Sequence, residues 1–520
     1  MDAGIAWGAL LLFEPVTERL SQRLVSLTGE APPSIDSSTS REEPIVSSDT
    51  PRAVPRLHLM DRDQCETIHQ ASLEILRKTG IRVHHDEALE LLREAGCVVS
   101  EGNRVRFPPG LVEWALAQAP STIALCDRGS SNARVRLRPG ESAFGPGSDC
   151  PNYLDPRDGK RRPFTLRDLE DCVRLADALP QISFLMSMGI PRDYSGNAYR
   201  RQYATLIEGS TKPVVFVCND AEDCRAIAGA AAAVAGGMEE LRLNPTLVLY
   251  SEPTTPLQQS TTATEKLLYM ASEGLPVVHS PAPMMGSTAP ATLAGGLALG
   301  NAEVLSSIVI HQRKRPGAPF LYGSGLHHMD MKTSISVYGA PEFQLARVAV
   351  ASMGRHYGLP TWGYAGHSDS ILFDEQAAAD AVFSVQTALL SGTNLIHDVG
   401  YLEAGLTTSP EMMVFTADMI DMMIHFTDGF GMSPDELALD VIHAVGPGGN
   451  YLGEDHTMRH FREAWQPVLF DRQRFDGWKA HGSRGLRARL QERTLEMLSS
   501  HAGSPLSDRL KLEVERILEL

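Results

Sequence analysis

Eight short runs of apolar residues, most of them separated by segments with helical patterning, constrain the fold of this chain more than any other feature. Successive runs begin about 30 to 43 residues apart. A strand followed by a helix fits that spacing, and eight such units predict an α/β fold closed into a (β/α)8 barrel. The runs cover residues 142–144, 183–188, 213–218, 246–250, 276–279, 319–322, 360–364 and 394–397.

Helix signals lie between these runs. The clearest is at 166–179, where Thr165 and Asp168 form the S/T-x-x-D/E signature of a helix start. A doubly wound open sheet is the alternative, but it needs a Gly-rich phosphate turn after a strand, and no GxGxxG motif follows any run. The other expected helices cover residues 221–235, 264–273, 293–313, 341–357 and 374–390.

The rest of the chain is predicted to flank a barrel of residues 140–408. Residues 1–56 predict a disordered or poorly ordered extension, because they are rich in Ser, Thr, Pro and Glu from 28 onward and lack periodicity. Residues 57–139 predict a small α+β unit, and residues 409–520 predict a helical segment packed on the barrel. The α+β unit is expected to contain a helix capped by Asp61 and closed by Gly80, a strand at 81–83, a helix at 87–95, a hairpin at 98–107 and a helix at 111–119.

Composition excludes several partners and compartments. The net charge of −17 argues against a nucleic acid or an anionic membrane surface as a partner. No apolar stretch reaches 18 residues, so no transmembrane helix is expected, and the apolar start lacks the Lys or Arg of a signal peptide. Seven scattered cysteines without a CxxC pair argue against structural zinc and fit reduced thiols in the cytoplasm.

Barrel active sites lie at the carboxyl ends of the strands, so the residues after each run are the candidates. These segments are polar and Gly-rich, although Gly and Asp there also make turns and cap helices. They include Ser148-Asp149, Asn219-Asp220, Ser251-Glu252, Ser280, Gly323-Ser324, His327-His328 with Asp330, Gly366 to Asp369, and His397-Asp398 with Glu403.

The Gly-His-Ser-Asp turn at 366–369 is the most informative of these segments. It follows Trp362 and Tyr364, which share one strand face because they are two residues apart. Aromatic faces attract quaternary ammonium groups, so these rings beside His367 predict a site for a cation. Tyr250, Tyr322 and Phe144 end other strands and are expected to complete the cage, with ordinary core packing as the alternative for each.

A metal site is the second possibility at this end. His327, His328, Asp330, His367, Asp369, His397 and Asp398 supply suitable ligand types. The first run lacks the His-x-His of zinc hydrolase barrels, and no nucleophile motif such as G-x-S-x-G is present, so no metal is predicted. A metal-dependent hydrolase or lyase using His327, His367 and His397, and a non-catalytic cation-binding protein, remain alternatives.

Several long segments resemble the trimethylamine methyltransferase family. They are TIHQASLEILRKTGIRVH within 57–84, FGPGSDCPNYLD (144–155), SEPTTPLQ (251–258), the run from Leu293 to Ser324, GLPTWGYAGHSDS (358–370) and VGPGGNYLGEDHTMRHFREAW (445–465). The resemblance implies a (β/α)8 barrel that moves a methyl group from a methylated amine to the cobalt of a separate corrinoid protein. No tightly bound cofactor is then expected, and a homo-oligomer is compatible with the sequence.

One departure from the family pattern concerns the substrate. The resemblance aligns His367 with the pyrrolysine of the trimethylamine enzymes, and members without pyrrolysine include glycine betaine methyltransferases. A betaine-type quaternary amine is therefore the expected substrate, although the sequence does not say which one. His367 and Asp369 are the expected catalytic residues, with His367 meeting a carboxylate tail and Asp369 orienting His367 or balancing the cation. The expected substrate-binding residues are Trp362, Tyr364, Tyr250, Tyr322, Phe144, His397 and Glu403.

Overall fold

Parallel strands form two sheets at the centre of the structure, a computed structural model that describes residues 52–520. The predicted extension 1–56 therefore lies almost wholly outside the described residues. The first sheet contains β10 (Val214–Phe216), β11 (Leu247–Ser251), β13 (Val277–His279) and β15 (Phe320–Leu321). The second contains β18 (Trp362–Tyr364), β19 (Leu395–His397) and β7 (Ala143–Phe144).

Isolated parallel bridges connect the two sheets. Tyr322 pairs with Thr361 between β15 and β18, and the predicted run 183–188, which is not a regular strand, provides the other link. In that region Ile182 pairs with Phe144 of β7, and Leu185 pairs with Val214 of β10. Seven of the eight predicted runs thus contain a strand, and the α/β fold class is confirmed.

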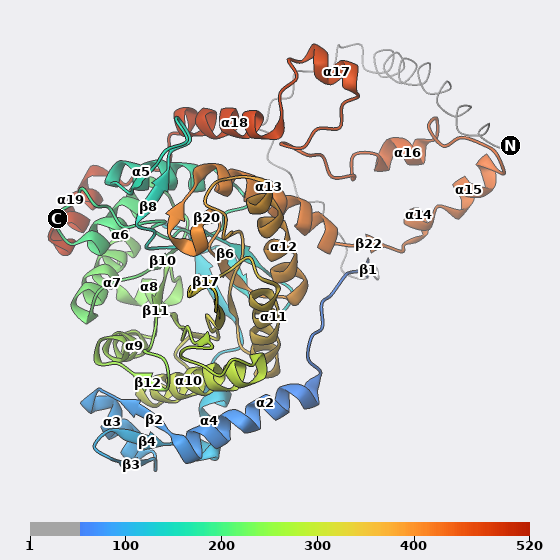
Figure 1. Cartoon of the computed structure of the whole chain (residues 1–520). Helices are drawn as coiled ribbons and strands as arrows, with labels where there is room; N and C mark the ends of the chain where they lie inside the picture. The colour runs from blue at the N-terminus through green and yellow to red at the C-terminus, as the bar shows by residue number, and fades with distance from the viewer. Residues whose placement is uncertain (1–51) are drawn as a thin grey trace. The chain divides into compact units, whose positions relative to one another are not determined.

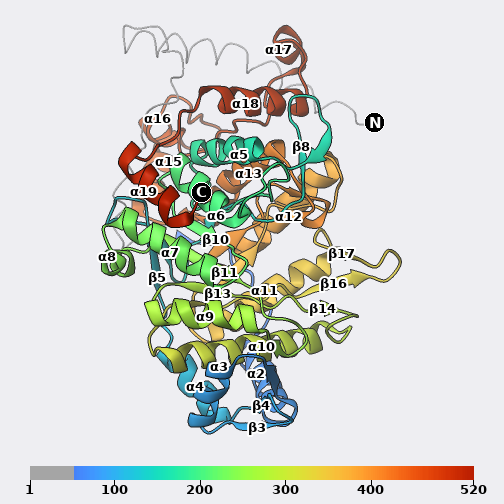
Figure 2. The same cartoon turned by 90° about the vertical axis from the view of Figure 1, so that its left-hand side faces the viewer.

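Helices surround these strands (Figure 1; Figure 2). Several begin and end where the sequence provides caps: Asp220 accepts a hydrogen bond from the Asp223 amide at the start of α7, and Gly236 ends that helix with φ 94°. The predicted capping box of Thr165 and Asp168 forms at the start of α5. The helices are α5 (Leu166–Ala178), α6 (Ala198–Gly209), α7 (Ala221–Ala235), α9 (Thr261–Glu273), α10 (Leu293–Lys314), α11 (Pro341–His356) and α12 (Glu375–Ser391).

The two faces of the strands contribute to different apolar clusters. Alternate residues such as Val214 and Phe216 pack with the surrounding helices, whereas Val215 belongs to a separate cluster. We call this second group the central cluster, because it gathers residues from both sheets and from the 183–188 run. Its strand members are Ala143, Phe184, Met186, Val215, Val248, Val278, Leu321, Trp362, Tyr364 and Leu395.

A hairpin that the sequence analysis missed covers the amino ends of the strands. Its strands are β5 (Ile123–Cys126) and β6 (Ala133–Leu137), and their apolar residues join the central cluster. The Cys126 amide donates to the carbonyl of Pro245 (2.8 Å), just before β11, which fixes the hairpin at this end. The carboxyl ends of the strands, where the candidate residues lie, are at the opposite end.

The predicted elements of the N-terminal unit are present, and the unit packs on α10. Gly80 closes the first helix after a five-residue π-helical turn. The elements are α2 (Arg62–Glu74), β2 (Ile81–Val83), α3 (Asp86–Glu94), β3 (Val98–Ser100), β4 (Arg104–Arg106) and α4 (Pro109–Gln118).

The C-terminal region consists of packed helices and an exposed arm. Helices α13 (Pro410–Thr427), α18 (Leu486–Ser500) and α19 (Asp508–Leu518) pack against α12, α5 and α7, respectively. Between α13 and α18, Figure 1 shows an arm that runs away from the helices around the sheets. The arm contains α14 (Pro434–Leu437), α15 (Leu439–Val445), α16 (Asp455–His460) and α17 (Phe475–Ala480).

Helix α10 is, within residues 52–520, the one helix that is long and apolar enough to cross a membrane. In this fold 78% of its apolar window is buried inside the protein. A helix that is apolar on all sides and covered on all sides is typical of a protein core.

Candidate active site

An aromatic cluster surrounds His397 at the carboxyl ends of β11, β18 and β19. The Trp362 ring stacks on the His397 imidazole, with centroids 4.3 Å apart and an interplanar angle of 26°. The Tyr364 ring lies 4.4 Å from His397, and the Tyr250 ring lies 5.3 Å from Trp362 and 5.6 Å from His397. The structure therefore brings together four of the expected substrate-binding residues.

Two expected cage residues, Phe144 and Tyr322, lie on the opposite face of their strands. Both belong to the cluster that packs against the helices, and the Tyr322 hydroxyl donates to Asn301 Oδ1 of α10 (2.8 Å). They therefore do not complete the cage as expected, because neighbouring residues of a strand point to opposite faces. In the first strand Ala143, not Phe144, is the residue in the central cluster.

Asp398 lies between the two histidines of the site. Its Oδ1 is 2.9 Å from His397 Nδ1, and its Oδ2 is 3.5 Å from His367 Nδ1. Burial alone would raise the pKa of this carboxyl, but the attraction of His397 and the contact with His367 outweigh burial and lower its pKa to about 2. Asp398 is therefore ionised at neutral pH, and its negative charge lies beside both imidazoles.

Asp369 does not contact His367 as expected. Its carboxylate accepts hydrogen bonds from the amides of Tyr338 (2.7 Å) and Gly339 (2.9 Å), so it fixes the loop before α11. His367 is fully buried. Its ring packs in T-shaped geometry against Tyr338 and against Phe343, with ring centroids 5.3 Å apart in each pair. Asp398, rather than Asp369, is the carboxylate beside His367.

Glu403 pairs with residues outside the aromatic cluster. Its carboxylate accepts from Arg161 Nε (2.9 Å) and from the Thr407 hydroxyl (2.6 Å), so its charge is already paired. His327, a ligand in the metal-dependent alternative, lies on β16 (His327–Asp330), with Nδ1 2.7 Å from the Gly325 carbonyl oxygen.

Two acidic side chains lie near the aromatic cluster. Tyr250 donates its hydroxyl proton to Glu252, whose side chain is exposed. Asp149, after β7, is half-buried, and its Oδ1 has no hydrogen-bond partner in the part of the chain that the structure describes. Burial and the neighbouring Glu252 raise the pKa of Asp149 to about 6. Within residues 52–520 neither carboxylate forms a salt bridge with Lys or Arg, so the pair is suited to a positively charged ligand.

Arg347 of α11 supplies the opposite charge. Its guanidinium lies 4.6 Å from the Phe343 ring and 4.7 Å from the Tyr364 ring, and the residue is buried. One Nη donates to the Ser324 carbonyl (2.6 Å) and the other to that of Leu326, while Nε has no partner among residues 52–520. Sequence reasoning missed Arg347 and Phe343, although their spacing of four at a helix start places them on one face.

Unpartnered polar atoms gather around this cluster. In residues 52–520, buried atoms without a hydrogen-bond partner include Trp362 Nε1, His367 Nδ1, Asp398 Oδ2 and both ring nitrogens of His397. Buried polar groups are rarely left unsatisfied, and such groups concentrated in one place indicate a site that meets a ligand or ordered water.

Comparisons with known proteins identify the family of this chain. The family model described as "Trimethylamine methyltransferase (MTTB)" matches residues 35–518. The trimethylamine methyltransferase MttB of Desulfitobacterium hafniense is 34% identical over 461 residues, which cover 88% of this chain and 92% of that protein. This chain belongs to the trimethylamine methyltransferase family. It is therefore a methyltransferase, as the sequence resemblance predicted.

Two further proteins are similar to this methyltransferase, one in sequence and one in fold. The glycine betaine methyltransferase of Desulfitobacterium hafniense is 32% identical over 429 residues, covering 82% of this chain and 89% of that protein. The crystal structure of the Methanosarcina barkeri monomethylamine methyltransferase (MtmB) has a TM-score of 0.51 and 12% identity, covering 86% of this chain and 89% of that chain. At that identity the second likeness concerns the fold alone.

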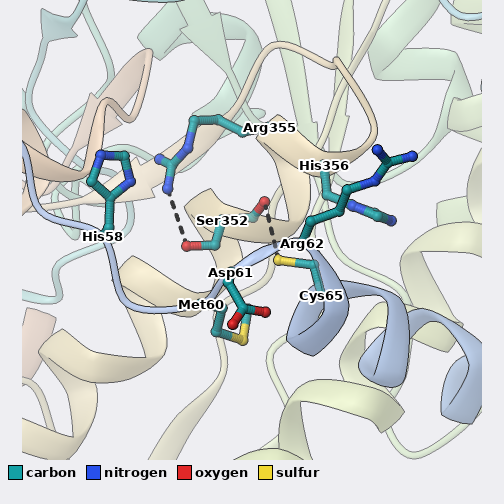
Figure 3. Close-up of a pocket in the computed structure, with 8 residues that line it drawn as sticks. All are labelled: His58, Met60, Asp61, Arg62, Cys65, Ser352, Arg355 and His356. Carbon is teal, nitrogen blue, oxygen red and sulfur yellow. Dashed lines mark hydrogen bonds between the residues drawn. The ribbon is translucent and has the colours of Figure 1, made fainter.

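A separate hollow of about 380 Å³ opens in the methyltransferase near the last turn of α11 (Figure 3). In Figure 3 Arg355 and Cys65 both point to Ser352, with the Arg355 Nη2 3.1 Å from the Ser352 hydroxyl. Phe343 and Arg347 lie in the first two turns of the same helix. The lining residues of the hollow are therefore distinct from the aromatic cluster; they are His58, Met60, Asp61, Arg62, Cys65, Ser352, Arg355 and His356.

Proposed function

We propose that this methyltransferase removes a methyl group from a betaine, a quaternary amine with a carboxylate tail, and passes it to the cobalt of a corrinoid protein. The observation that carries the proposal is the pairing of unlike charges around one aromatic cluster. Glu252 accepts a hydrogen bond from Tyr250 and has Asp149 as a charged neighbour, and Arg347 lies against the Tyr364 ring. A betaine carries both charges within one small molecule.

The substrate cation is held by aromatic faces and charge in this proposal. A trimethylammonium group has no N–H to donate, so Trp362, Tyr364 and Tyr250 bind it through their ring faces. His367 and Arg347 meet the carboxylate, and Asp398 positions His367 and His397. Asp369 acts indirectly by fixing the loop that carries Tyr338.

The chemistry requires little covalent help from the protein. The cobalt(I) electron pair forms the new Co–C bond, the C–N bond breaks, and its electrons leave with nitrogen as a neutral tertiary amine. Cobalt(I) becomes methylcobalt(III), so no other oxidant or proton is needed. The chain's contribution is to orient one methyl group toward the open end of the site and to exclude water.

A closed (β/α)8 barrel is the architecture we propose for the site. It is supported by the continuous order of parallel pairings from β7 through the 183–188 run and β10, β11, β13, β15, β18 and β19 back to β7, although three links are isolated bridges. The site residues then surround the mouth of the barrel, where a corrinoid protein can approach. All seven cysteines are free and buried, which supports a cytoplasmic location.

The deciding experiment measures methylation of free cob(I)alamin by the full chain. The substrate panel contains glycine betaine, carnitine, γ-butyrobetaine, proline betaine, tetramethylammonium and trimethylamine. We expect one betaine to react at least about tenfold faster than trimethylamine, because the site lacks a long side chain at position 367 to engage a free amine. Trimethylamine turnover equal to that of the best betaine would contradict the proposal.

A further inference from the structure

The short helices of the exposed arm between α13 and α18 have little apolar packing to stabilise them. No residue of α14, α15 or α16 is buried against any part of the chain that the structure describes. Helices of four to seven residues are not stable alone in water. Small units without an apolar core are commonly stabilised by a disulfide or a metal ion, and no cysteine lies in the arm.

Three possible metal ligands converge in this arm. His456 and His460 are four residues apart on α16, so both rings lie on one face, with centroids 4.3 Å apart. Asp435 of α14 faces them, and its Oδ2 is 3.0 Å from His460 Nε2. Ligand atoms of the three residues all lie within 4.8 Å of one another.

Neighbouring groups orient two of the three ligands. His460 Nδ1 is 2.7 Å from Glu463 Oε1, so the carboxylate accepts the Nδ1 proton, and a metal ion would replace the proton that Nε2 shares with Asp435 Oδ2. A carboxylate behind a histidine is the usual support for a metal-bound imidazole. Arg459 donates to Asp435 Oδ1 (2.8 Å), which leaves Oδ2 directed at the histidines.

We propose that Asp435, His456 and His460 bind one zinc-like divalent ion that ties α14 to α16. Two imidazoles and a carboxylate are ligands that zinc accepts, and water completes four-coordination. Ligand atoms around one zinc ion are about 3.4 Å apart at bond lengths near 2.1 Å, so closure requires only small side-chain movements. His456 Nε2 must exchange its 2.9 Å bond to the Asp435 carbonyl for the metal.

The first test titrates the metal-free full chain with Zn²⁺ in the presence of a chromogenic chelator. We expect one equivalent per chain, and an affinity at least about tenfold weaker in His456→Ala and in His460→Ala, because even the loss of a supporting group typically costs 10- to 100-fold. Glu463→Gln should weaken binding within that range. His443→Ala, an exposed histidine of α15 outside the cluster, is the matched control and should bind like the wild type.

The second test asks whether the ion ties the arm together. Trypsin can cleave after Arg459 and Arg462, which lie in and directly after α16. Zinc at ten times its dissociation constant should slow this cleavage by about tenfold in the wild type and in His443→Ala, but not in His460→Ala. Zinc binding that survives both histidine substitutions, or cleavage that zinc does not slow, would overturn the proposal independently of methyl transfer.

Discussion

At the scale of single residues, the site depends on which strand face a side chain occupies. Trp362 and Tyr364 share a face, and the central cluster contains both. Tyr322 is one residue beyond Leu321, which belongs to that cluster, and so it points to the helices. One position along a strand thus separates an aromatic ring of the candidate site from one that packs against the helices.

Trp362→Ala should weaken binding of a quaternary ammonium ligand by very roughly 2- to 30-fold. The indole belongs to the aromatic cluster, and a cation–π contact contributes about 0.5–2 kcal/mol, which corresponds to that range. Isothermal titration calorimetry with glycine betaine and tetramethylammonium measures the loss. Tyr322→Phe is the control, since its ring faces α10; if both variants lose the same affinity, the assignment of faces is wrong.

His367→Ala should discriminate between ligands with and without a carboxylate. A charge-assisted hydrogen bond contributes about 1.5–3 kcal/mol, so betaine affinity should fall about 10- to 150-fold while tetramethylammonium affinity changes little. Arg347→Met should show the same selectivity if both groups meet the carboxylate. Equal losses for the two ligand classes would assign His367 a packing role beside Tyr338 and Phe343.

Asp149→Asn tests the acidic side of the site through pH. The pKa of Asp149 is raised to about 6, above the ordinary 3.8, so the carboxyl becomes charged as pH rises through 6. Cation affinity in the wild type should therefore rise between about pH 5 and 7, and this rise should be smaller in Asp149→Asn.

The same substitution should change stability in the opposite sense. A raised carboxyl pKa favours the protonated form in the folded state, so Asp149 increasingly destabilises the ligand-free protein as pH rises from 3.8 through 6. Asp149→Asn should raise the melting temperature at pH 8 and leave it nearly unchanged at pH 4. A lower melting temperature at pH 8 would show that the carboxylate is stabilised by its neighbours instead.

At the scale of secondary-structure elements, helix starts and strand positions could be predicted, whereas the contacts between elements could not. Thr165, Asp220 and Asp374 act through local bonds to their own helices, and such bonds are visible in the sequence. Asp369 acts on a loop 30 residues away, and the β5–β6 hairpin closes ends of strands far along the chain. Nothing local in the sequence specifies those partners, so their roles needed the structure.

Asp220→Ala should lower the free energy of unfolding by about 0.5–2 kcal/mol, because the Asp223 amide loses its cap at the start of α7. Asp220→Ser keeps a capping oxygen, so its free energy of unfolding should fall by much less than that of Asp220→Ala. Urea unfolding followed by circular dichroism measures both variants. An alanine variant as stable as wild type would mean that solvent replaces this cap without cost.

At the scale of the whole molecule, the described chain Arg52–Leu520 forms one compact unit and contains every residue of the candidate site. Its first strand, β1 (Arg52–Ala53), pairs with β22 (Phe430–Gly431) at the base of the arm. The Arg52 side chain adds a bond from Nε to the carbonyl of Asp428 (3.1 Å). The start of the described unit is therefore attached to the C-terminal region.

Removal of residues 1–51 should preserve the fold and the rate of methyl transfer. The site residues contact strands and helices within 143–398, and residues 1–51 fall within the extension 1–56 that the sequence predicts to be disordered or poorly ordered. A second shortened chain that starts at residue 55 also lacks β1. It should keep activity, but its β22 at the base of the arm has no partner strand. Methylation of cob(I)alamin compares both chains with the full protein, and trypsin cleavage after Arg459 reports the arm. If the chain from residue 52 lost activity while remaining folded, residues 1–51 would have a direct role in catalysis.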